Sequence, residues 1–211
     1  MPKMSPPARR PATKSTARAK VEILSFDDRD EWRAWLASHH ATSPGVGLRI
    51  AKKGARTTSV TYAEAVEIAL EWGWIDGKKE ALDEEAWVQR FSRRAAKSPW
   101  SKINRDKALA LIAEKAMAPP GLAEVARAKK DGRWDAAYDS AKTSTVPADL
   151  TVALQANRRA AAFFETIDRA NRYAILWRIQ TAKKESTRAE RIARFVGMLA
   201  RHETIHPTKR G

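Results

Sequence analysis

Residues 74–94 read WIDGKKEALDEEAWVQRFSRR, and this stretch decides the fold that the sequence predicts. Both of its ends contain tryptophan and branched residues, whereas residues 83–85 in its middle are acidic. Side chains near the second end alternate between two faces, which is the period of a half-buried strand. We therefore expect two antiparallel strands, 74–82 and 87–93. A tighter hairpin at Asp76-Gly77, itself a turn signal, is the competing interpretation.

The residues before this hairpin predict one further strand and two helices. Apolar residues alternate with glycine and arginine over 46–50, as in a half-buried strand. Asp27 is a suitable N-cap for a helix over 28–39. Thr61 and Glu64 have the spacing of a capping box, so an amphipathic helix should follow them.

The rest of the chain has a helical pattern. We expect helices to begin at Ser98-Pro99, at Pro147 and at Asp168, and Thr187 with Glu190 forms a second capping box. Further breaks are expected at Pro119-Pro120-Gly121 and at Asn157. The predicted fold class is α+β, with a small antiparallel sheet and helices in the N-terminal half and a helical C-terminal half.

Three regions are expected along the chain. Residues 1–20 contain six basic residues, four prolines and no acidic or aromatic residue, which predicts a disordered basic arm. Residues 21–116 should form the α+β subdomain with the antiparallel hairpin. Residues 117–211 should form a helical subdomain with a short basic tail, the boundary lying near 117–121.

Composition excludes several classes of protein. The chain has 211 residues, 43% of them hydrophobic, and eight tryptophans, so it is not disordered as a whole. It has no cysteine, which excludes a disulfide scaffold, an iron–sulfur site and thiol catalysis. No apolar run has the length of a membrane span, and no export signal is visible, so a cytoplasmic location is expected.

One sequence motif resembles a zinc site, and we reject that interpretation. Residues 202–206 read HETIH, which matches the zinc-protease pattern H-E-x-x-H. The residues after it include no third ligand, and Pro207 weakens the helix that must hold the two histidines. We therefore expect neither a metal nor a cofactor, and no catalytic residue is assigned.

The densest basic run, residues 90–107, is the candidate binding site, because it has seven basic residues and one acidic residue. Arginine side chains beside the free N–H groups of a helix start form an anion site. Asp76, on the neighbouring strand, would orient an arginine or act as an acid or base. The alternative is a solvated basic face in which Asp76 is an ion-pair partner. The expected anion-binding residues are Arg90, Arg93, Arg94, Lys97, Trp100, Lys102, Asn104 and Arg105.

The tryptophans divide into two groups in this interpretation. Trp100 lies inside the basic run and is expected to contribute its ring to the site. The others considered lie on apolar faces and are expected in the core, where each ring buries a large area. They are Trp32, Trp35, Trp72, Trp87 and Trp177.

Several separated motifs resemble the YdeI/OmpD-associated family, also called the bacteriocin-protection family. They are GWIDGKK (73–79), LDEEAWVQRFSRR (82–94), KSPWSKIN (97–104) and NRYAILWRIQTAKKESTRAERIARFVGMLARHE (171–203). The resemblance covers about residues 21–203. It implies a role in resistance to bacteriocins or cationic antimicrobial peptides, and no known reaction. Some descriptions of the family add a periplasmic location and an outer-membrane porin as partner.

The formal net charge of +15 directs the functional prediction. Such a charge repels cationic peptides, so protection by direct capture is disfavoured. We expect a non-enzymatic, stress-protective protein that binds a polyanion such as nucleic acid. The alternative is an enzyme or receptor for a small anionic ligand, bound at an Arg/Trp pocket around residues 76–105. A peripheral membrane or porin partner ranks last, because no strongly amphipathic basic helix is visible.

Overall fold

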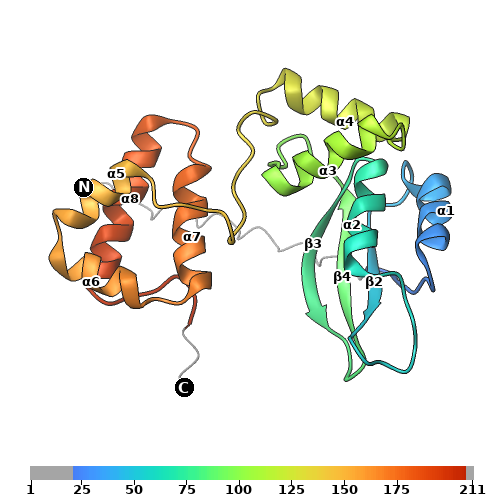
Figure 1. The fold of residues 1–211 in the computed structure, drawn as a ribbon, viewed down its shortest axis with the longest axis horizontal. Helices are drawn as coiled ribbons and strands as arrows, with labels where there is room; N and C mark the ends of the chain where they lie inside the picture. Colours follow the sequence, from blue (N-terminus) through green and yellow to red (C-terminus); the bar gives the residue numbers. More distant parts are fainter. Residues whose placement is uncertain (1–20, 208–211) are drawn as a thin grey trace, which may run out of the picture.

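The computed structural model describes residues 21–207, which form two lobes with separate hydrophobic cores (Figure 1). The N-terminal lobe, residues 21–137, has its core residues between Trp32 and Ala137. The C-terminal lobe, residues 146–207, has its core residues between Leu150 and Leu199. Residues 138–145 form the connecting segment. The prediction for residues 1–20 lies outside the described residues.

The N-terminal lobe contains the predicted α+β arrangement. Its four-stranded sheet has the order β1-β2-β4-β3, in which β2 pairs with β4 and β4 with β3 in antiparallel fashion. The short β1 pairs with β2 in parallel, so the sheet is mixed rather than purely antiparallel. The elements are β1 (Ile23–Leu24), α1 (Arg29–His39), β2 (Val46–Ala51), α2 (Tyr62–Glu71), β3 (Trp74–Ala81), β4 (Ala86–Arg93), α3 (Lys102–Ala113) and α4 (Pro119–Lys130).

The hairpin β3–β4 confirms the prediction drawn from residues 74–94. The turn lies where the acidic residues were expected, with the Asp83 carboxylate accepting hydrogen bonds from the backbone N–H groups of Glu85 and Ala86. The competing turn signal at Asp76-Gly77 produces an irregularity instead, because the pairing register shifts between Asp76 and Lys79. The buried Gln89 side chain donates to the Gly77 carbonyl at 2.7 Å, which satisfies a backbone acceptor at this interruption.

Helices α1 and α2 pack on one face of the sheet (Figure 1). Trp32 is fully buried, contacts the Phe91 ring at 5.6 Å and donates from Nε1 to the Ala65 carbonyl at 3.2 Å. The capping box of Thr61 and Glu64 is confirmed.

Two helix starts on the N-terminal lobe differ from the predictions. Asp28 rather than Asp27 caps α1, and its carboxylate accepts from two N–H groups of the first turn. Ser101 rather than Ser98 caps α3, because Pro99 lies in the loop before that helix.

The predicted break at Pro119-Pro120-Gly121 is the first turn of α4. Proline is tolerated there because first-turn N–H groups have no intrahelical acceptor. Gly121 packs directly against the end of α2: a Cβ atom at this position would lie 2.3 Å from the Glu71 carbonyl oxygen.

The C-terminal lobe is helical, as predicted. Asn157 ends one helix and, in addition, caps the next, which the sequence analysis did not predict; its side chain accepts from the Ala160 N–H. The second capping box is wrong, because α8 begins before Thr187 and Lys184 occupies its N-cap. The helices are α5 (Ala148–Gln155), α6 (Arg158–Thr166), α7 (Arg169–Gln180) and α8 (Glu185–Ala200).

The two cores favour a later domain boundary than the one expected near residue 117. Val125 and Ala128 of α4 belong to the core of the N-terminal lobe, and the Ala118 N–H donates to the Glu71 carbonyl at 3.1 Å. We propose that the boundary lies in the connecting segment, residues 138–145.

The packing of α4 on α2 predicts opposite effects for two helical glycines. Gly121→Ala should destabilise the protein by about 1–3 kcal/mol, because the added methyl group meets backbone atoms that cannot move aside. Gly197→Ala in α8 should stabilise it by about 0.5–1 kcal/mol, since alanine restricts the unfolded chain. The nearest atom to that added Cβ is Arg201 Nη1 at 3.6 Å. Urea unfolding followed by circular dichroism measures both; equal stabilities would contradict this packing.

Candidate functional site

The structure places the predicted anion-binding residues in environments of different exposure. Arg94 and Trp100 lie together, with the guanidinium carbon 3.8 Å from the ring centroid, but both side chains are buried. Trp100 is 2% exposed and Arg94 6%, so neither presents a face to a polymer. Arg94 directly follows β4. Its backbone N–H donates to the Gly73 carbonyl, which fixes the position of the backbone at the end of the strand.

The burial of Arg94 has electrostatic consequences. Burial lowers the pKa of its guanidinium to about 10, against the opposing effect of the Glu124 carboxylate, so the group stays charged at neutral pH. Its Nη1 donates to the Pro99 carbonyl at 3.2 Å. Among the described residues, its Nε and Nη2 atoms have no hydrogen-bond acceptor.

The other predicted residues are spread over the lobe. Arg90 is half-buried on β4, and Arg93 and Lys97 are exposed. Lys102 is paired with Asp139 at 2.7 Å and Arg105 with Asp106 at 3.4 Å. The half-buried Asn104 belongs to the first turn of α3, where its backbone N–H donates to the Ser101 hydroxyl. Their anion-binding role stays a prediction.

Asp76 lies on β3 and interacts first with a tyrosine. The Tyr62 hydroxyl donates to its carboxylate at 2.8 Å. Burial, together with the Asp76 charge and this hydrogen bond, raises the pKa of Tyr62, so its hydroxyl remains a donor over the physiological range. Asp76 thereby positions the Tyr62 ring, and its charge also acts on Arg94 and Tyr138. Its role as an acid or base stays a prediction.

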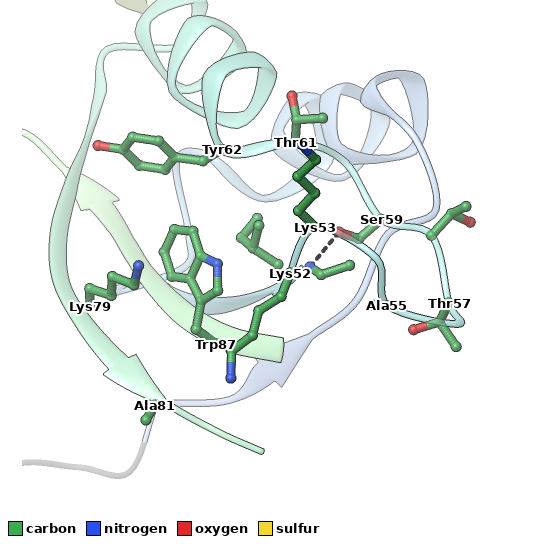
Figure 2. Close-up of a pocket in the computed structure, with 13 residues that line it drawn as sticks. Lys52, Lys53, Ala55, Thr57, Ser59, Thr61, Tyr62, Lys79, Ala81 and Trp87 are labelled. Atoms are coloured by element: carbon green, nitrogen blue, oxygen red, sulfur yellow. Dashed lines mark hydrogen bonds between the residues drawn. The ribbon is translucent and has the colours of Figure 1, made fainter. Parts of the chain in front are cut away.

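A different place in the N-terminal lobe has the geometry of a binding pocket (Figure 2). This pocket, which we call the lysine–tryptophan pocket, has a volume of about 820 Å³ and lies between the loop after β2, the start of α2 and the β3–β4 hairpin. Within the described part of the chain its lining includes three lysines and no carboxylate. The lining residues are Ile50, Ala51, Lys52, Lys53, Ala55, Thr57, Thr58, Ser59, Thr61, Tyr62, Lys79, Ala81 and Trp87.

Trp87 is the central aromatic residue of this pocket. Its ring is half-buried, and the Lys79 ammonium lies 4.0 Å from the ring centroid. Figure 2 shows these two side chains next to each other. The Tyr62 ring lies beside it, with the centroids 5.6 Å apart. A half-exposed indole next to cations can bind a planar ring and an anionic group of the same ligand.

The pocket wall is held by backbone contacts. The Ala51 N–H donates to the Ser59 hydroxyl at 2.8 Å, which fixes the loop after β2 (Figure 2). The Lys52 ammonium donates to the carbonyls of Asp83 and Glu84 in the hairpin turn. Lys53 has no ion-pair partner in residues 21–207, so its charge is available to a ligand.

Two tryptophans differ from the expected division in exposure. Trp87 packs against the core, as expected, and also lines the pocket. Trp100 is buried, and its role in an anion site stays a prediction. The sequence signal for the pocket is a pair of lysines, 52–53, after β2 and a second pair, 78–79, in β3. Apolar strand residues adjoin each lysine pair in the sequence. Strand β4 pairs with both β2 and β3, and this pairing brings the two lysine pairs toward the same end of the sheet.

The HETIH segment has no metal-site geometry. It lies beyond the end of α8, so its two histidines are not one turn apart on a helix. His202 stacks on the Phe163 ring at 4.7 Å, and Glu203 is paired with Arg201 at 2.9 Å. Across residues 21–207, no group of three or more His, Cys, Asp or Glu side chains is placed to hold a metal ion.

Comparison with protein families divides the chain as its two cores do. Residues 143–202 match the family described as Bacteriocin-protection, YdeI or OmpD-Associated, which confirms the resemblance over most of the C-terminal lobe. Residues 24–124 match a domain of unknown function (DUF8412). No curated protein and no solved structure matches the chain. None of the described helices is both long enough and apolar enough to cross a bilayer.

All three tyrosines of the chain should titrate above their ordinary pKa of about 10. Burial is the main cause in each case; Asp76 adds to it at Tyr62 and Tyr138, and burial with nearby Tyr138 and Asp139 raises the pKa of Tyr173 to about 12. Because the unfolded chain loses these protons first, the contribution to stability is full below pH of about 10 and falls as the pH rises further.

Ultraviolet absorbance titration of the folded and denatured protein measures this difference. Asp76→Asn should lower the pKa of Tyr62 and leave that of Tyr173 in place. A tyrosine of the folded protein that ionises at the ordinary value would contradict the described environments.

Proposed function

We propose that this protein binds single-stranded nucleic acid through the lysine–tryptophan pocket, without catalysing a reaction. The observation that carries the proposal is the half-buried Trp87 ring with the Lys79 ammonium 4.0 Å from its centroid, in a pocket lined by lysines. Single-stranded nucleic acid offers both chemistries in each repeating unit, a ring that stacks and a phosphate that binds ammonium groups.

The described contacts support this ligand over a neutral one. Hydroxyl groups of Thr57, Thr58 and Thr61 lie in the lining and can bond to sugar or phosphate oxygens. The pocket volume of about 820 Å³ lies in the range of small-ligand sites, which accommodates a nucleotide rather than a duplex. Stacking on tryptophan accepts any base, so we expect weak sequence preference.

The protective role is proposed from the family match. The chain carries a net charge of +15, and a cationic peptide is repelled by such a protein. Protection against bacteriocins would therefore act indirectly, through a bound polyanion, as part of a stress response. A nucleic-acid ligand suits a cytoplasmic location, which we propose in preference to a periplasmic one with a porin as partner.

The alternative function, an enzyme or receptor for a small anion around residues 76–105, is favoured by one observation. Two N–H-bearing atoms of the buried Arg94 have no acceptor among the described residues. Trp100 offers little to such a ligand, because its side chain is only 2% exposed.

The nucleic-acid proposal predicts a distinct effect for two adjacent lysines. Lys79→Met should weaken the affinity for a fluorescently labelled oligothymidylate several-fold and lower the salt slope by roughly 0.7, the value for one phosphate of a single strand. Lys78→Met is the matched control: Lys78 is paired with Glu80 at 2.8 Å and does not line the pocket. Its affinity should stay within about twofold of the unmodified protein, since a surface pair contributes little.

Trp87→Leu tests the aromatic part of the same site. Loss of one stacked base should cost about 1–3 kcal/mol of binding free energy while the salt slope stays unchanged. Fluorescence anisotropy at several salt concentrations measures both quantities. The proposal is wrong if oligothymidylate does not bind at low salt, or if Lys78→Met and Lys79→Met weaken binding equally.

A further inference from the structure

A second pocket, separate from the lysine–tryptophan pocket, lies at the junction of the two lobes. This interlobe pocket has a volume of about 360 Å³. Lys97, Pro99, Asp131 and Arg133 of the N-terminal lobe line one side of it, and residues 180–183, the last residue of α7 and the three that follow it, line the other. Figure 1 shows the end of α7 and the segment after α4 on the facing sides of the two lobes.

Within residues 21–207, Tyr138 and Asp139 of the connecting segment contact both lobes: on the N-terminal side, the Tyr138 N–H donates to the Trp100 carbonyl and Asp139 is paired with Lys102. The side-chain amide of Gln180 bonds twice to Asp139 in the connecting segment, accepting from its N–H at 3.1 Å and donating to its carboxylate at 2.7 Å. The Tyr173 hydroxyl donates to the Asp139 carbonyl at 3.0 Å. Tyr138 and Trp177 add an edge-to-face ring contact at 6.0 Å. A ligand in the interlobe pocket would add a direct link between the lobes to these contacts through the connecting segment.

Arg133, which lines this pocket, has one buried donor atom without an acceptor among the described residues. Its side chain is 6% exposed, and its Nε donates to the Asp131 carboxylate at 2.8 Å. Its Nη1 donates to the Ser98 carbonyl and to Glu124, whereas its Nη2 has no acceptor among the described residues. A buried guanidinium N–H without an acceptor is costly, which favours an acceptor supplied by a ligand.

The charges around Arg133 do not balance. Arg94, Arg127 and Arg133 share two carboxylates, those of Glu124 and Asp131. Two further cations of the lining, Lys97 and Lys183, are exposed and have no ion-pair partner in the described part of the chain. Asp131, which is paired with Arg133, also lines the pocket, so among the described lining residues three cations face one carboxylate.

We propose that the interlobe pocket binds a small phosphorylated molecule, whose phosphate group is held by Lys97 and Arg133 from one lobe and Lys183 from the other. A phosphate group has three oxygen acceptors for these donors and neutralises the excess charge. The remaining lining combines apolar and polar residues, which suits a compact organic body with polar groups; these residues are Pro99, Asp131, Gly132, Ala136, Gln180, Thr181 and Ala182. Because donors from both lobes contact one ligand, its binding fixes their relative position.

The test uses the full chain and isothermal titration calorimetry with inorganic phosphate and with pyrophosphate at low ionic strength. We expect one saturable site. Lys97→Met and Lys183→Met should each weaken it by about tenfold, the loss of one charge-assisted hydrogen bond. Both lysines are exposed, so the variants should fold, which circular dichroism confirms; the buried Arg133 is left intact.

Lys184→Met is the control. Lys184 is adjacent to Lys183 but does not line the interlobe pocket. This variant should bind pyrophosphate within about twofold of the unmodified protein. Absence of saturable binding, or equal weakening in Lys183→Met and Lys184→Met, would overturn the proposal. The nucleic-acid proposal is tested by Lys79→Met alone, so the two can fail separately.

Discussion

The packing of the N-terminal lobe near the connecting segment depends on one buried group, the carboxylate of Glu124. It accepts hydrogen bonds from Arg127 and Arg133, and these arginines also donate to the backbone carbonyls of Arg94 and Ser98. One carboxylate therefore secures the loop between β4 and α3 to helix α4. Without this carboxylate, the nearby guanidinium groups would lose most of the negative charge that balances theirs. Removing one partner of a buried ion pair is strongly destabilising.

The parts of the fold that depend on local signals could be predicted from the sequence. The β3–β4 hairpin follows from alternation around an acidic turn, and the start of α2 follows from the spacing of Thr61 and Glu64. Helix α6 was missed because Asn157 both ends α5 and caps α6, and a stop signal alone does not reveal the second role. Thr187 failed for the opposite reason, because capping spacing also occurs inside a helix.

The candidate site could be predicted only in part, because burial is decided by contacts between distant segments. Nothing in the basic run 90–107 indicates that Arg94 turns inward onto Trp100 and meets the charge of Glu124 from α4. Likewise, the alternation that places Trp87 on the same face of β4 as Phe91 does not show that its ring stays half-buried and lines a pocket. Charge and residue type predict an anionic ligand. The fold determines which lysine and arginine side chains are accessible to that ligand.

The ammonium of Lys79 above the Trp87 ring has a consequence for the protein at high concentration. A half-exposed indole on a solvent-accessible surface is a point of self-association, because two such rings gain by excluding water from between them. Here the ring carries a hydrated, repelling charge 4.0 Å from its centroid, which a second copy of the chain also carries. The Lys79–Trp87 contact leaves the indole accessible to an oppositely charged molecule. The same contact therefore opposes self-association of the unliganded protein.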